Sequence, residues 1–228
     1  MASFDIKTIM TMVLIAVALE VMMLILLAFL VKSYRGVKTF AAARLIALIS
    51  YSLLFSPIRP LALLEGIGSC LLILSSSVMC SSLGKFTHQK IKFKYLLFYN
   101  FTFAFIQALL ILFANIYVWK AITHCLFQIG LMGLAAYLLM RTPDRGFVES
   151  RRFLVGIFWG MQMVFILRII GLIRHPSPEF FAPNLPSALS LIVVFIYTFL
   201  VADGFIMMVC QRLYDDLRLT ADTDELTQ

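Results

Sequence analysis

The chain has 228 residues, of which 62% are hydrophobic and 14% are charged, and its formal net charge is +7. A soluble domain has roughly 45–50% apolar and about 25% charged residues, so this composition indicates contact with lipid rather than a soluble core. The basic charge does not require a nucleic-acid partner, because basic residues beside membrane spans commonly face the anionic cytoplasmic leaflet. We therefore expect an all-α integral membrane protein with no nucleic-acid partner.

Seven apolar runs, bounded by charged residues, Pro or Gly, are long enough to cross a hydrocarbon layer about 30 Å thick. They are expected over residues 9–31, 37–55, 61–83, 93–113, 121–140, 153–173 and 185–209. The first run is too long for a signal peptide and is followed by basic residues that act as a stop, so we expect it to be retained. The outer loops are too short to form a folded domain.

The distribution of basic residues predicts the orientation. Thirteen Lys and Arg residues lie on one side of the spans: Lys32, Arg35, Lys38, Lys85, Lys90, Lys92, Lys94, Arg141, Arg145, Arg151, Arg152, Arg212 and Arg218. Four lie on the other: Lys7, Arg59, Lys120 and Arg174. Because basic loops stay in the cytoplasm, the amino terminus is expected outside and the carboxyl terminus inside.

Five ionisable residues fall inside the predicted spans: Glu20, Arg44, Glu65, Arg168 and Asp203. Such a side chain is costly in a bilayer unless it is paired or lines a wet cavity. Matching by depth predicts an outer pair, Glu65 with Arg168, and an inner pair, Arg44 with Asp203, and leaves Glu20 without an obvious partner. The charges either lock helix packing or line a polar cavity that opens outward.

Three arginines, Arg59, Arg168 and Arg174, are expected near the outer surface with Glu65. Guanidinium groups bind carboxylate and phosphate oxygens bidentately, so this set is a candidate ligand-binding site. Arg59 and Arg174 alternatively anchor the protein at the interface. With no folded outer domain, we expect a ligand that is small or amphiphilic, and a lipid or an anion fits this description.

Several chemistries find no support in the sequence. The seventh span has no lysine to hold retinal, and no hydrolase, metalloprotease or phosphate-loop motif occurs, so we expect no enzyme activity in this chain. Metal or haem binding is not expected either, because the cysteines, Cys70, Cys80, Cys125 and Cys210, lack paired spacing and His175 falls in a loop. A small carrier or channel remains the alternative, since intramembrane charges also serve ion pathways.

The sequence after the seventh span carries two signals. Ile206, Cys210, Leu213, Leu217 and Thr220 are spaced alternately by four and three residues, which is a short heptad seam, although an amphipathic helix lying on the membrane looks similar. Residues 219–228 then read LTADTDELTQ. This stretch resembles the junction at which a signalling helix enters a GGDEF diguanylate cyclase domain.

The resemblance implies a sensory role in a bacterial inner-membrane protein that makes cyclic di-GMP. It implies a seven-helix membrane sensor domain over residues 1–210 and a cytoplasmic signalling helix over 211–228, cut off at the start of a GGDEF domain. The catalytic loop and nucleotide site of that family are absent from this sequence. We expect a parallel homodimer, because a cyclase of this family joins two nucleotide-bearing domains and a heptad seam needs a partner strand.

Overall fold

The computed structural model describes residues 6–31, 34–55, 61–114, 117–142, 147–174 and 185–225. These residues form seven α-helices and one π-helical turn, and they contain no strand. The helices are α1 (Ile6–Leu30), α2 (Val37–Leu54), α3 (Leu61–Phe86), α4 (Phe93–Leu109), α5 (Tyr117–Met140), α6 (Val148–Arg174) and α7 (Leu185–Glu225), and the π-helical turn η1 (Leu110–Ala114) continues α4.

Each of the seven α-helices in the described residues contains a stretch long and apolar enough to cross a membrane. Large apolar side chains also cover the outside of the bundle; Phe29, Phe98, Phe101 and Leu112 are each at least 68% exposed. Exposed apolar surface on this scale is suited to lipid rather than water. The prediction of an all-α, multi-pass membrane protein is therefore confirmed.

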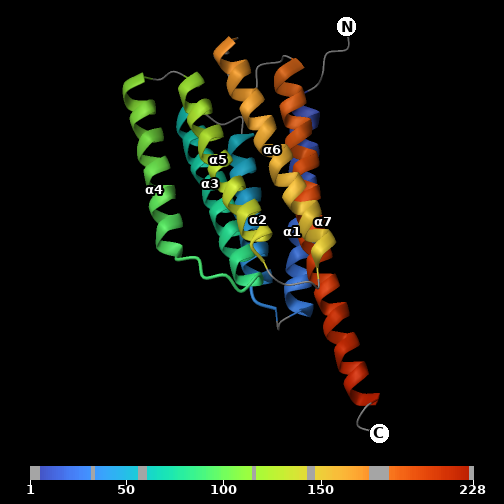
Figure 1. Ribbon diagram of the computed structural model, residues 1–228. Helices are drawn as coiled ribbons and strands as arrows, with labels where there is room; N and C mark the ends of the chain where they lie inside the picture. The colour runs from blue at the N-terminus through green and yellow to red at the C-terminus, as the bar shows by residue number, and fades with distance from the viewer. Residues whose placement is uncertain are drawn as a thin grey trace.

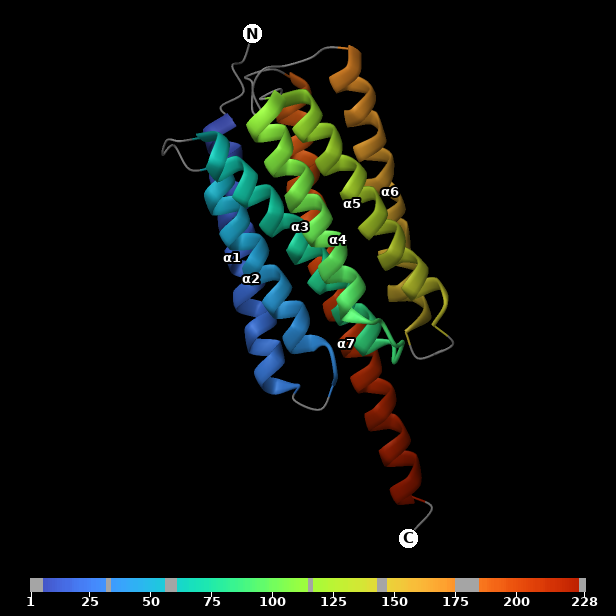
Figure 2. The same ribbon diagram turned by 90° about the vertical axis from the view of Figure 1, so that its left-hand side faces the viewer.

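Six helices form a closed ring in the order α1, α2, α3, α5, α6, α7, with α7 packed again on α1. The fourth helix, α4, lies outside this ring against α3 and α5 (Figures 1 and 2). Figure 1 also shows the two termini at opposite ends, which we call the amino-terminal end and the carboxyl-terminal end of the bundle.

The serines of α3 attach it to α2 through backbone carbonyls. Ser75 donates to the carbonyl of Ala43 at 2.7 Å, and Ser82 donates to that of Gly36 at 2.8 Å. Gly36 has a φ of 104°, and a Cβ there would lie 2.7 Å from the carbonyl oxygen of Ser82. The close approach of α2 and α3 at the carboxyl-terminal end therefore requires glycine.

The longest helix is α7, which runs for 41 residues without a break. At about 1.5 Å per residue it is roughly 60 Å long, about twice the thickness of a hydrocarbon layer. It continues beyond the carboxyl-terminal end of the ring (Figure 1). The boundary predicted at residue 210 therefore falls inside one continuous helix.

Candidate functional site

Glu65, Tyr117 and Arg168 gather at the amino-terminal end of the bundle. They come from α3, α5 and α6. The Tyr117 hydroxyl lies close enough to the Arg168 guanidinium and to the Glu65 carboxylate to interact electrostatically with both. Glu65 and Arg168 are both half-buried. The fold thus brings together an acid and a base that are about a hundred residues apart in sequence, and places both beside Tyr117. Sequence reasoning did not identify this tyrosine.

The other two predicted ligand-binding arginines do not join this cluster in the described residues. Arg59 lies outside those residues. Arg174 is exposed on the last turn of α6, six residues after Arg168. At 3.6 residues per turn, six residues separate two side chains by about 120° around the helix. Arg174 therefore lies on a different face of α6 from Arg168.

Below this cluster, polar side chains line the contacts of α5 with α3 and α6. The Ser76 hydroxyl donates to Oε1 of Gln128 at 3.0 Å. His124 and Gln162 are buried, and within the described residues His124 Nδ1 and Gln162 Nε2 have no hydrogen-bond partner. His124 also lies in the electrostatic surroundings of Arg168. Sequence reasoning missed these residues. The signal that could have found them is a single glutamine in each of two apolar spans, Gln128 in α5 and Gln162 in α6, because amide side chains form hydrogen bonds between membrane helices.

A buried ion pair joins α1 to α2. The Arg44 guanidinium bonds the Glu20 carboxylate, and both side chains are at least 93% buried. The same guanidinium donates to the backbone carbonyl of Thr198 on α7 at 3.3 Å. This geometry corrects two predictions, because the ionic partner of Arg44 is Glu20 rather than Asp203, and Glu20 is paired.

The physical reason is that α2 packs directly on α1. Glu20 lies ten residues before the end of α1, and Arg44 lies seven residues after the start of α2, so the two differ in depth by about 4.5 Å. A long arginine side chain spans that difference. Depth alone did not reveal which helices are neighbours.

Asp203 lies on an exposed face of α7, in the electrostatic surroundings of Glu20 but without an ion pair in the part of the chain described. Ile196, Asp203, Cys210 and Leu217 are spaced by seven residues, and all four are exposed. Ile206 is half-buried and Leu213 is 39% exposed between them. We call this row, with Ile206 and Leu213, the α7 seam; it extends the predicted heptad pattern upward into the bundle.

A second set of contacts holds α7 where it leaves the bundle, and we call it the α7 exit cluster. The Tyr34 hydroxyl, from the α1–α2 loop, donates to the Asp216 carboxylate on α7. Arg212 donates to the carbonyl of Phe86 at 2.9 Å and to Nε2 of His88 at 2.8 Å. Ser150 on α6 donates to Oε1 of Gln211 at 2.8 Å. Three other parts of the fold therefore contact α7 between Gln211 and Asp216, over less than two turns.

The contacts of Tyr34 in the α7 exit cluster change the pKa of its phenol. Partial burial, followed by the hydrogen bond to the Asp216 carboxylate, raises the pKa of the Tyr34 phenol to about 12 from an ordinary value of 10. The Arg212 guanidinium lies 5.6 Å from the centroid of the same ring, within reach of a cation–π contact. Tyr34 is therefore a neutral hydrogen-bond donor at physiological pH.

Comparison with known proteins adds no family: no family model, curated protein or solved structure matches this chain.

Proposed function

We propose that this chain is a membrane-embedded sensory input domain that binds a small or amphiphilic ligand and controls an attached diguanylate cyclase through α7. The observation that carries the proposal is the construction of α7. One unbroken helix contacts α1 and α6 inside the bundle, is gripped by the α7 exit cluster, and continues outward with the α7 seam exposed. A rigid helix of this kind transmits a displacement from the bundle to whatever follows it.

The orientation belongs to the proposal. The carboxyl-terminal end of the bundle carries the exposed Arg35, Lys38 and Lys85, together with the lysines at the start of α4. The positive-inside rule supports a cytoplasmic position for this end, in the inner membrane of a bacterium. The output helix is then delivered to the cytoplasm, where the nucleotide substrate of a cyclase is found.

The ligand site of this proposal is the cluster of Glu65, Tyr117 and Arg168. It lies near the outer surface in the proposed orientation, and it combines a guanidinium group with a phenol, two donors suited to an anionic head group. The unpartnered polar atoms of His124 and Gln162 beneath it offer further hydrogen bonds. Binding that shifts α6 would act on α7 directly, because the two helices pack together.

Dimerisation through the α7 seam supports control of a cyclase. The α7 seam is exposed along its length except at the half-buried Ile206, and its heptad spacing favours a second copy of α7 as its neighbour. Cys210 continues the same face to the α7 exit cluster, and Leu217 continues it outside the bundle. A parallel pair of α7 helices would then carry two output domains side by side.

The experiment that tests this function varies the phase of α7. A reporter GGDEF domain is joined after Gln228, and residues are inserted between Leu219 and Thr220. Because a heptad repeat is restored by seven residues, a seven-residue insertion is expected to preserve the basal cyclic di-GMP output in membranes, whereas a four-residue insertion is expected to change it several-fold.

The matched control places the same insertions in a flexible Gly-Ser linker after residue 228, where phase has no meaning. Equal output from all insertions in α7 would overturn control through this helix. Flux of small solutes into proteoliposomes, combined with phase-independent output, would instead establish the carrier or channel.

A further inference from the structure

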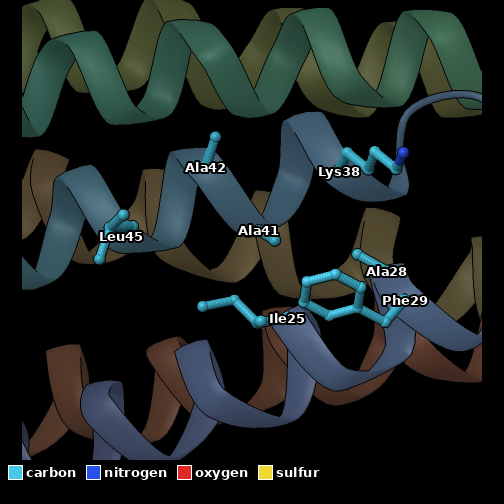
Figure 3. A pocket seen from close by; sticks show the side chains of 7 residues that line it. All are labelled: Ile25, Ala28, Phe29, Lys38, Ala41, Ala42 and Leu45. Carbon is cyan, nitrogen blue, oxygen red and sulfur yellow. The ribbon is translucent and has the colours of Figure 1, made fainter.

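A groove of about 340 Å³ lies between α1 and α2, on the lateral surface of the bundle. Its lining residues are Ile25, Ala28, Phe29, Lys38, Ala41, Ala42 and Leu45. Figure 3 shows the alanines along the two helices, with Phe29 and Ile25 beside them and Lys38 near the loop that joins the helices. Its volume falls in the roughly 300–1,000 Å³ range of small-molecule sites.

The groove exists because short side chains line part of a helix pair. Ala28 and Ala41 are buried, whereas Phe29 is 68% exposed and Leu45 is 43% exposed. Alanines leave space between the helix backbones, and the longer side chains stand up on both sides. The result is an apolar groove that faces the lipid rather than the interior of the ring.

The position of the groove matches the boundary between head groups and acyl chains. Lys38 is the second residue of α2, and Leu45 lies seven residues further along, about 10 Å deeper. Ile25, Ala28 and Phe29 lie in the last turns of α1, which ends at Leu30. The charged end of the groove is thus at the helix ends and the apolar end is within the span.

The charge around the mouth of the groove is positive. Lys38 and Arg35 are exposed, and Lys85 donates to the hydroxyl of Thr39 at 3.1 Å. Neither Lys38 nor Lys85 forms an ion pair with another described residue. Basic side chains at this depth attract anionic lipids by about 1 kcal/mol each.

We propose that this groove is a binding site for an anionic phospholipid, whose phosphate contacts Lys38 and whose acyl chain lies along the alanines of α1 and α2. The site differs from the ligand cluster of Glu65 and Arg168, which lies at the opposite end of the bundle. It also differs from the α7 seam. The lipid lies between α1 and α2, beside the loop that carries Tyr34. Because Tyr34 belongs to the α7 exit cluster, binding of the lipid is expected to affect the contacts of that cluster.

Native mass spectrometry of the full chain tests this site. The protein in detergent is titrated with dioleoyl phosphatidylglycerol or dioleoyl phosphatidylcholine, and the dissociation constant of the first adduct is measured. Two variants probe the site: Lys38→Gln removes the charge, and Ala42→Phe fills the groove from an exposed position. Their matched controls on α4 are Lys94→Gln and Ala108→Phe, also at exposed positions.

Wild-type protein is expected to bind phosphatidylglycerol more tightly than phosphatidylcholine. Lys38→Gln is expected to weaken phosphatidylglycerol binding about fivefold and to leave phosphatidylcholine unchanged, since one basic residue contributes about 1 kcal/mol. Ala42→Phe is expected to abolish the tight adduct, and both control variants are expected to bind like wild type. Circular dichroism confirms that each variant is helical.

Three results would overturn the proposal. One is an equal loss of phosphatidylglycerol in Lys38→Gln and Lys94→Gln, which indicates general attraction to the basic end. Another is a folded Ala42→Phe variant that binds phosphatidylglycerol as tightly as the wild-type protein does. The third is conversion of a dimer to a monomer by Ala42→Phe with no change in lipid binding, which assigns the groove to a second copy of the chain.

Discussion

Glu20 on α1 and Arg44 on α2 form an ion pair buried inside the membrane-spanning bundle, and Arg44 also reaches the carbonyl of Thr198 on α7. One arginine therefore joins three helices in the interior of the bundle, where both charged side chains are at least 93% buried. Breaking a buried pair by removing one partner leaves an uncompensated charge, which costs more than removing both.

This pair predicts a large coupling energy. Arg44→Met is expected to destabilise the protein by about 3 kcal/mol, because the Glu20 carboxylate is left buried and unpaired. The double variant with Glu20→Met is expected to be more stable than Arg44→Met alone. Equilibrium unfolding in mixed micelles measures both. The control cycle pairs Arg44→Met with Lys94→Gln on α4, a helix that packs on α3 and α5 rather than on α1 or α2, so these effects are expected to add nearly independently. Additive effects for Glu20 with Arg44 would show that the contact is not energetically coupled.

The α7 seam predicts a specific crosslinking pattern. Cys210 is exposed on the seam, so mild oxidation in membranes is expected to give a disulfide-linked dimer that Cys210→Ser abolishes. In that background, Leu213→Cys and Leu217→Cys are expected to restore the dimer. Leu219→Cys is the control, because it is 64% exposed but lies two residues from the seam position of Leu217 and points to another face. Equal crosslinking at all three positions would indicate collision rather than a parallel interface.

The α7 exit cluster predicts the titration of one tyrosine. The difference in phenolate absorbance between wild type and Tyr34→Phe is expected to appear near pH 12, since burial and the Asp216 carboxylate raise the pKa of Tyr34 to about 12. A phenol with a raised pKa stabilises the folded state below its unfolded pKa near 10, and this contribution is lost as the pH rises toward 12. In Asp216→Asn the Tyr34 step is expected at lower pH. An unchanged step in that variant would mean that the hydrogen bond is not formed.

The cluster of Glu65, Tyr117 and Arg168 predicts recognition of an anionic head group. Arg168→Gln keeps most of the side-chain bulk but removes the charge, and oleate binding is expected to weaken at least tenfold, about 1.4 kcal/mol. Arg174→Gln is the matched control, because Arg174 lies on the same helix but on another face. Isothermal titration in detergent measures both affinities. Unchanged affinity in folded Arg168→Gln would remove this cluster as the binding site.

The seven helices were predictable from sequence because a bilayer imposes a local rule. Backbone groups in hydrocarbon must bond within the helix, so each span needs a continuous apolar run. The run over 37–55 became α2 at Val37–Leu54 almost unchanged. Helix ends were less predictable where polar residues continue the helix: α6 begins at Val148 rather than 153, and Arg151 there donates to the carbonyl of Thr142.

The partner of each intramembrane charge was decided only by the tertiary structure. Hydropathy reports the depth of Arg44, but Glu20 and Asp203 both lie within reach of that depth on different helices. The packing of α2 on α1 selected Glu20 and left Asp203 exposed on α7. Side-chain complementarity between helices distant in sequence makes that choice, and neither apolar periodicity nor charge order along the chain contains it.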